Sequence, residues 1–176
     1  MPNIRHELTI GAPAERVYAA ITTQEGLSSW WTPDVETSAA VNSIARFGFG
    51  GYEKEMRIDE LTPNKRVQWH CLKGEQEWVS TTLTFELLGG DGEAILRDRP
   101  EAKDQVGQQG EGEMTLLMFS QENWKAETPM FAECNYTWGR FLRSLKDYCE
   151  GRRGTLWPHQ HSIASQSAGR EAFADA

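Results

Sequence analysis

The stretch "TPMFAECNYTWGRFLRSLKDYCEG", residues 128–151, decides which fold this chain can adopt. Thr128 has a side chain that can cap a helix, Pro129 suits a first helical position, and Gly151 is typical of a helix end. The pattern therefore predicts one long helix. Its apolar residues form a continuous stripe that another layer must cover: Phe131, Cys134, Trp138, Phe141 or Leu142, Leu145, and Tyr148 or Cys149.

Strand-like alternation elsewhere in the chain supplies that layer. Residues 4–10, "IRHELTI", alternate apolar and polar side chains, and period two returns from about residue 35 to residue 120 between turn stretches such as "TPNK". In the run "RVQWHCL", for example, Val67, Trp69 and Cys71 share one face. We therefore predict an α+β domain in which an opening strand and six further antiparallel strands pack against the C-terminal helix.

Residues 12–33 predict two short helices between the first strand and the rest of the sheet. In the second helix, Leu27, Trp30 and Trp31 have the spacing i, i+3 and i+4, and Pro33 ends the helix. Both indoles can then lean toward one side. We expect Trp30 to wedge the helices against the sheet, and Trp31 to lie at the mouth of a pocket or in contact with a partner.

Two segments lack a sustained period. Residues 89–113 are rich in glycine and charge, which predicts a long mobile loop that acts either as a lid or as a surface insertion. Residues 155–176 predict a flexible tail. We accordingly expect one domain over residues 1–154.

The composition narrows the class of protein. The net charge of -8 argues against a protein that neutralises nucleic-acid phosphates. No apolar run approaches the roughly 20 residues that cross a bilayer, and the first residues do not read as a secretion signal. The 3 cysteines have no paired spacing, which suits a reducing compartment. We expect a cytoplasmic protein without membrane insertion.

Motifs for several chemistries are missing from the sequence. Neither a GxSxG nucleophile elbow nor a GxxxxGK[ST] phosphate loop occurs. His159 and His161 are close in sequence, but they lie in the predicted tail without a third ligand. We therefore expect neither a metal nor a cofactor.

A curved sheet with one apolar face and a long helix can enclose a pocket lined by aromatic side chains. The same residues also suit a close-packed core, and the sequence leaves both interpretations open. Lys54, Thr81, Gln121 and Asn135 are polar candidates for orienting a ligand. The predicted ligand-binding residues are Trp30, Trp31, Phe49, Lys54, Met56, Trp69, Thr81, Phe119, Gln121, Trp124, Cys134 and Trp138.

A series of motifs resembles a known superfamily. These motifs are "APAERVYAAITTQEGLSSWWT", "FGFGGYEKEMRIDELTPNKRVQWHC", "WVSTTLTFEL" and the C-terminal helix. Together, over about residues 4–151, they resemble the SRPBCC or START-like superfamily, and in particular its bacterial branch homologous to the activator of the ninety-kilodalton heat-shock protein ATPase.

The resemblance implies a helix-grip fold like that of the birch pollen allergen, with a curved antiparallel sheet wrapped around the C-terminal helix. It also implies a cavity for lipids or other hydrophobic molecules between the two. Trp30 matches the typical tryptophan of the second helix, and Trp31 a position that is often aromatic. Gln121 and Asn123 depart from an HxGW-like turn that Trp124 matches.

We expect the protein to bind a small hydrophobic molecule in this cavity without catalysis. One alternative is a cochaperone-like module that contacts a chaperone. Another is a cyclase-like or hydrolase-like enzyme that uses His70, Lys54 or Glu77 as an acid or base. A homodimer is compatible with each of these hypotheses.

Overall fold

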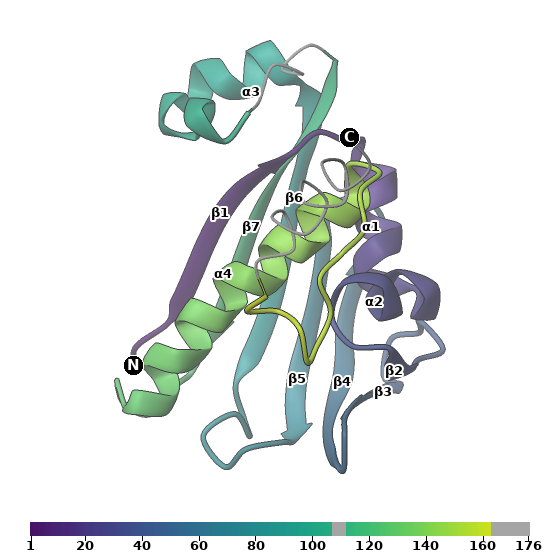
Figure 1. Cartoon of the computed structure of the whole chain (residues 1–176), viewed down its shortest axis with the longest axis vertical. Helices are drawn as coiled ribbons and strands as arrows, with labels where there is room; N and C mark the ends of the chain where they lie inside the picture. The colour runs from purple at the N-terminus through teal and green to yellow at the C-terminus, as the bar shows by residue number, and fades with distance from the viewer. Residues whose placement is uncertain (107–111, 163–176) are drawn as a thin grey trace, which may run out of the picture.

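The computed structural model describes residues 1–106 and 112–162. These residues form a seven-stranded antiparallel sheet in the order β1-β7-β6-β5-β4-β3-β2 (Figure 1). The first strand pairs with the last, so β1 and the short β2 form the two edges. The strands are β1 (Ile4–Ile10), β2 (Asp34–Glu36), β3 (Ile44–Phe49), β4 (Tyr52–Thr62), β5 (Arg66–Lys73), β6 (Thr82–Asp91) and β7 (Glu113–Glu122).

The long helix α4 (Pro129–Cys149) lies diagonally across one face of this sheet (Figure 1). The Thr128 hydroxyl accepts a hydrogen bond from the backbone N–H of Phe131 at 3.2 Å, as a helix cap does. The helix ends before Gly151, whose φ of +86° lies in the left-handed region that glycine tolerates. The predicted α+β class and the helix-grip fold are therefore confirmed.

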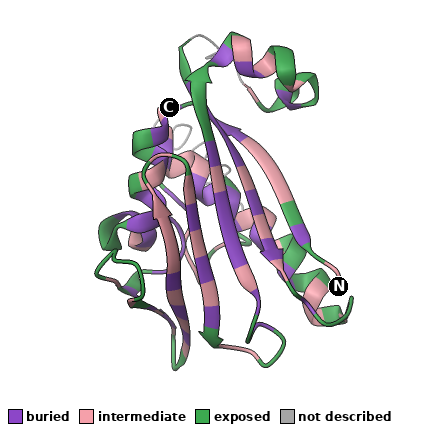
Figure 2. Ribbon diagram, turned by 180° about the vertical axis from the view of Figure 1, so that it is seen from behind, coloured by how far each residue is buried: buried purple, intermediate pink, exposed green. Residues whose placement is uncertain are grey.

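The sheet supplies the apolar face that α4 needs. Val67, Trp69 and Cys71 of β5 are buried, whereas the residues between them are only partly covered. The same alternation marks most of the strands when the sheet is viewed from its outer side (Figure 2). One face thus packs against the helix and the other faces solvent, as period two predicts.

Helices α1 (Ala14–Thr22) and α2 (Gln24–Trp30) connect the two edges of the sheet and lie beside α4 (Figure 1). Gly26 makes their close approach possible, because a Cβ atom there would lie 2.6 Å from the Ala19 carbonyl oxygen. The described part of the chain contains no helix that is long and apolar enough to cross a membrane.

The segment 89–113, for which we expected a long mobile loop, contains regular structure. Strand β6 continues to Asp91, followed by α3 (Gly92–Asp98) and the 3-10 helix η1 (Pro100–Gln105). Ile95 of α3 packs against Met114 and Leu116 of β7 in a small separate core. The sequence did not predict α3 and η1, because these elements are too short to produce a periodic pattern. Residues 107–111 lie outside the described residues, and the role of a lid stays a prediction.

The prediction that a flexible tail begins at residue 155 places the start of the tail too early in the chain. Residues 155–162, which we name the C-terminal strap, run between α4 and α2 (Figure 1). The backbone N–H of Trp157 donates to the Trp31 carbonyl at 2.9 Å, and that of Thr155 donates to the Ser144 hydroxyl at 2.7 Å. The strap therefore belongs to the packed domain, while residues 163–176 lie outside the described part of the chain.

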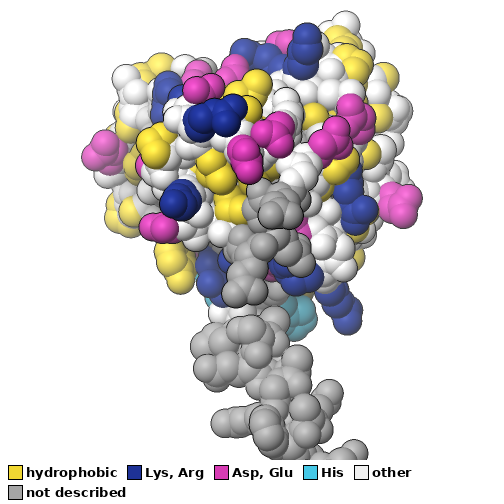
Figure 3. Space-filling model, turned by 90° about the horizontal axis from the view of Figure 1, so that it is seen from above, with side chains coloured by type: hydrophobic (Ala, Val, Ile, Leu, Met, Phe, Trp, Pro, Cys, Tyr) yellow, Lys and Arg dark blue, Asp and Glu magenta, His cyan; other side chains and the backbone are white. Residues whose placement is uncertain are grey.

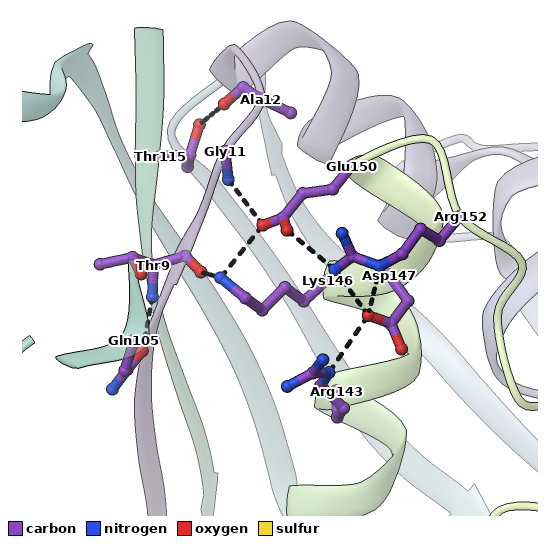
Figure 4. Close-up of polar contacts among 10 residues, drawn as sticks. All are labelled: Thr9, Gly11, Ala12, Gln105, Thr115, Arg143, Lys146, Asp147, Glu150 and Arg152. Carbon is purple, nitrogen blue, oxygen red and sulfur yellow. Dashed lines mark hydrogen bonds and ion pairs between the residues drawn. The ribbon is translucent and has the colours of Figure 1, made fainter. Parts of the chain in front are cut away.

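A polar network ties the end of α4 to the first strand (Figure 4). The Glu150 carboxylate accepts a hydrogen bond from the Gly11 backbone N–H at 2.9 Å and pairs with Lys146 at 3.0 Å. Lys146 also donates to the Thr9 carbonyl. Burial by itself would raise the pKa of Glu150, but the hydrogen bond from Gly11 and the charge of Lys146 hold it below its ordinary value.

Replacing Glu150 with glutamine should therefore destabilise the protein in a pH-dependent way. We expect Glu150→Gln to lower the free energy of unfolding at pH 7 by about 1–3 kcal/mol, as for a lost charged hydrogen bond. A depressed carboxylate pKa stabilises the folded state above the unfolded value of 4.5, and the contribution disappears as the pH falls through the folded pKa.

Urea denaturation of both proteins at pH 7 and pH 3 measures this difference. The exposed Glu127 offers a control, because Glu127→Gln should change little at either pH. An equal loss for Glu150→Gln at both pH values would show that its charge is not what stabilises the junction.

Candidate functional site

A cavity of about 350 Å³ lies between the first part of α4, the β3–β4 hairpin, the turn after β5 and the C-terminal strap. Its volume falls at the lower end of the range for small-molecule pockets. The apolar part of its lining comes from Trp31, Phe49, Trp78, Cys134, Met130, Trp138, Phe141 and Trp157. The polar part comes from Tyr52, Lys54, Glu75, Glu133, Thr137 and Gln160.

Trp31 forms the floor between the sheet and α4. Its ring is stacked on that of Trp69, with the centroids 6.0 Å apart, and lies 5.4 Å from the ring of Trp138. On the strap side, the Trp157 ring meets that of Phe49 edge to face at 5.8 Å. These contacts hold the aromatic walls in fixed orientations.

The polar end of the cavity is built around Lys54 of β4. Its ammonium nitrogen pairs with the Glu75 carboxylate, and the two side chains are 8% and 34% exposed. The same nitrogen lies 4.0 Å from the ring centroid of Trp78, 5.1 Å from that of Tyr52 and 5.4 Å from that of Phe49. Distances under 6 Å are those of cation–π contacts. We name Phe49, Tyr52, Trp78 and Glu75 the lysine cage.

Electrostatics within the lysine cage favours an ionised Glu75. Burial would raise the pKa of its carboxyl group, but the hydrogen bond and the charge of Lys54 hold it below its ordinary value. Burial and the neighbouring Glu75 carboxylate raise the pKa of the Tyr52 hydroxyl. At neutral pH this end of the cavity therefore holds an ion pair beside a neutral phenol.

The thiols near the cavity are unreactive by the same reasoning. Burial raises the pKa values of Cys71 and Cys134 to about 11. Since the thiolate is the nucleophilic form, neither group suits covalent catalysis near pH 7. The indole N–H of Trp78 also donates to the Cys134 sulfur at 3.2 Å.

The structure divides the predicted ligand-binding residues into two groups. Trp31, Phe49, Lys54, Cys134 and Trp138 line the cavity. The others belong to the close-packed core and do not line it: Trp30, Met56, Trp69, Thr81, Phe119, Gln121 and Trp124. For this second group, the core interpretation that the sequence left open is the one that the structure favours.

Two polar candidates are occupied by contacts inside the core. Gln121 donates to the Thr81 hydroxyl at 3.0 Å and accepts from the indole N–H of Trp138 at 2.9 Å. The Thr81 hydroxyl in turn donates to the Trp78 carbonyl at 2.6 Å. This chain of hydrogen bonds positions Trp138 and Trp78 in the cavity wall rather than presenting polar groups to a ligand. Asn135 is exposed on α4.

The residues proposed as an acid or base in the enzyme hypothesis do not lie together in the cavity. His70 pairs with Arg57 and Thr82 across the sheet and does not line the cavity. Glu77 is exposed and accepts a hydrogen bond from Thr128. His161 stacks on Tyr136, with the ring centroids 5.5 Å apart. Within residues 1–106 and 112–162, no cluster of acidic, histidine and cysteine side chains could hold a metal ion.

Sequence reasoning missed Trp78, Glu75 and Trp157. In the stretch "WVSTTLTFEL", β6 begins only at Thr82, and Val79 is 37% exposed. The chain turns before that point, with the Trp78 N–H donating to the Glu75 carbonyl at 2.8 Å, and this turn brings Trp78 inside. For Trp157, a large aromatic residue within a supposed tail was an available signal that the segment packs.

The burial of Trp31 overturns part of its predicted role. Trp31 lines the cavity, but it is 1% exposed, so the expected contact with a partner was wrong. We now expect Trp31→Ala and Trp30→Ala each to lower the free energy of unfolding by about 3–5 kcal/mol, as for other buried tryptophans. Chemical denaturation measures both values. A loss below about 1 kcal/mol for Trp31→Ala would contradict the packing described above.

Comparison with known proteins finds a matching family model and several similar solved structures. Residues 11–150 match the family model described as Activator of Hsp90 ATPase homolog 1-like protein. The solution structure of the Aha1 dimer from Colwellia psychrerythraea is 32% identical, with a TM-score of 0.68, and the match covers 88% of this chain and 100% of that one. No match is found among curated protein sequences.

More distant structures share the fold. Protein MLL2253 from Mesorhizobium loti is 16% identical over 82% of this chain and 94% of its own, with a TM-score of 0.61. Protein SSP2350 from Staphylococcus saprophyticus is 14% identical over 88% of this chain and 97% of its own, with a TM-score of 0.63. From the match over residues 11–150 and the similarity to the Colwellia protein, we conclude that this chain belongs to the family of Activator of Hsp90 ATPase homolog 1-like proteins.

Proposed function

We propose that this protein binds a small, mainly apolar molecule in the cavity between α4 and the sheet, and that it does so without catalysis. The observation that carries the proposal is the cavity itself, whose aromatic walls meet a polar end built around the pair Lys54 and Glu75. An apolar pocket with a few convergent polar groups is the usual form of a small-molecule site. The fold of the family is compatible with ligand binding.

The chemistry of the lining supports binding rather than turnover. Lys54 and Glu75 neutralise each other, and the neighbouring thiols are protonated at neutral pH because burial raises their pKa values. A general base or a nucleophile would need a group held ready for the substrate. The lining residues instead offer shape, aromatic surface and a small number of hydrogen bonds.

A second candidate function is contact with a chaperone, which the description of the family model favours. The relative from Colwellia is described as a dimer, and a homodimer of this chain is part of the same proposal. Positive and negative side chains are interspersed on the face seen from above (Figure 3). This distribution and the net charge of -8 support a protein partner over a nucleic acid. A location in the cytoplasm stays a prediction.

A neutral fluorescent probe tests the binding function directly. N-phenyl-1-naphthylamine should bind with saturation and brighten, because the cavity removes it from water. Thr137 lines the cavity on α4, so Thr137→Phe should fill part of the space and weaken binding roughly tenfold or more. Fluorescence titration gives both dissociation constants.

The neighbouring Tyr136 provides the matched control. It is 65% exposed and stacks on His161, which also approaches Thr137, but it does not line the cavity. Tyr136→Ala should therefore leave probe affinity unchanged. Equal binding by Thr137→Phe and the unmodified protein, or no saturable binding at all, would contradict the proposed site.

A further inference from the structure

The lysine cage is a cation-binding arrangement that the protein fills with its own side chain. Three aromatic rings within 5.4 Å of one ammonium nitrogen, together with a carboxylate, form the kind of cage that recognises organic cations. Here the ammonium belongs to Lys54, which reaches the cage from the same strand as Tyr52. A cationic ligand would have to displace a covalently attached competitor.

An anionic ligand meets the opposite obstacle. Among the described residues that line the cavity, Lys54 is the only cationic side chain, and it is already paired with Glu75. A carboxylate that took Lys54 would leave the Glu75 carboxylate partly buried without its cation, which costs free energy. Glu133, exposed on α4 at the cavity lining, adds further negative charge.

A neutral polar group meets neither obstacle. An ammonium carries three donors, so a ligand carbonyl or hydroxyl oxygen can accept from Lys54 while the ion pair stays intact. A hydroxyl can also donate to the Glu75 carboxylate. The flat indole walls formed by Trp31, Trp78 and Trp138 favour stacking of a planar ring.

We propose that Lys54, by occupying the lysine cage, makes the cavity selective for electrically neutral, planar aromatic molecules that carry a hydroxyl or carbonyl group. This inference rests on the proposed binding function and specifies its ligand class. It also assigns Lys54 and Glu75 as the residues that determine charge selectivity.

Three probes with one ring system separate charge from shape. At pH 7, 2-naphthol is neutral, 2-naphthoate is an anion and 2-naphthylmethylammonium is a cation. Isothermal titration calorimetry should show that the unmodified protein binds 2-naphthol about tenfold or more tightly than either charged probe. Binding of a charged probe with equal or higher affinity would overturn the inference.

Two substitutions should then shift the preference toward opposite charges. Glu75→Gln keeps the shape of the side chain and frees Lys54, so 2-naphthoate should gain about tenfold in affinity. Lys54→Met removes the internal cation, so 2-naphthylmethylammonium should gain about tenfold through Glu75 and the rings. Glu127→Gln is the control, because it makes the same change in net charge as Glu75→Gln at an exposed position that does not line the cavity, and it should leave the relative affinities of the probes unchanged.

Circular dichroism and thermal melting establish which variants fold. If Lys54→Met is unfolded, the order of the probes in the unmodified protein and the response of Glu75→Gln decide the matter. If the affinity of folded Glu75→Gln for 2-naphthoate does not rise relative to that for 2-naphthol, the inference is overturned. Failure to bind 2-naphthol by a protein that still binds N-phenyl-1-naphthylamine overturns it too, and leaves the proposed function standing. If none of the naphthyl probes nor the phenylnaphthylamine binds any form, the binding function itself fails.

Discussion

The packing of Trp31 is the constraint on which most of this structure depends. Its ring lies 4.5 Å from that of Phe47 in β3, 6.0 Å from that of Trp69 in β5 and 5.4 Å from that of Trp138 in α4, measured between centroids. Its carbonyl accepts the hydrogen bond from Trp157 that holds the C-terminal strap. One residue therefore connects the short helices, the sheet, the long helix and the strap.

This arrangement explains why a cavity exists where it does. On the side of Trp31 toward β1, Trp138 and Phe119 approach to 4.4 Å and close the core. On the other side, the charged head of Lys54 replaces further apolar filling, and space remains beside it. The cavity and its polar end thus have one origin.

Sequence patterns predicted the larger elements and failed where the chain changes direction within a few residues. The helix over residues 129–149 and the alternation through Val67, Trp69 and Cys71 follow from periodicity, a pattern to which many residues contribute. Trp78 and Glu75 instead depend on one turn before β6, in which Ser80 has a φ of +74°. A turn of this kind shifts the parity of its neighbours, and periodicity cannot register such a shift.

The sequence by itself determined that a long amphipathic helix needs an antiparallel sheet to cover it. The reason is that the spacing of apolar residues in each element is local and can be recognised without knowing what the element packs against. It also determined the position of Trp31 beside Trp30 and of Lys54 on a face with Met56. Only the tertiary structure decided that Lys54 contacts Glu75 and Trp78. It also decided that Gln121 accepts a hydrogen bond from Trp138, and that Trp157 forms part of the cavity wall. Those contacts join residues that are distant in the chain, and their geometry follows from how the sheet, the helix and the strap pack together.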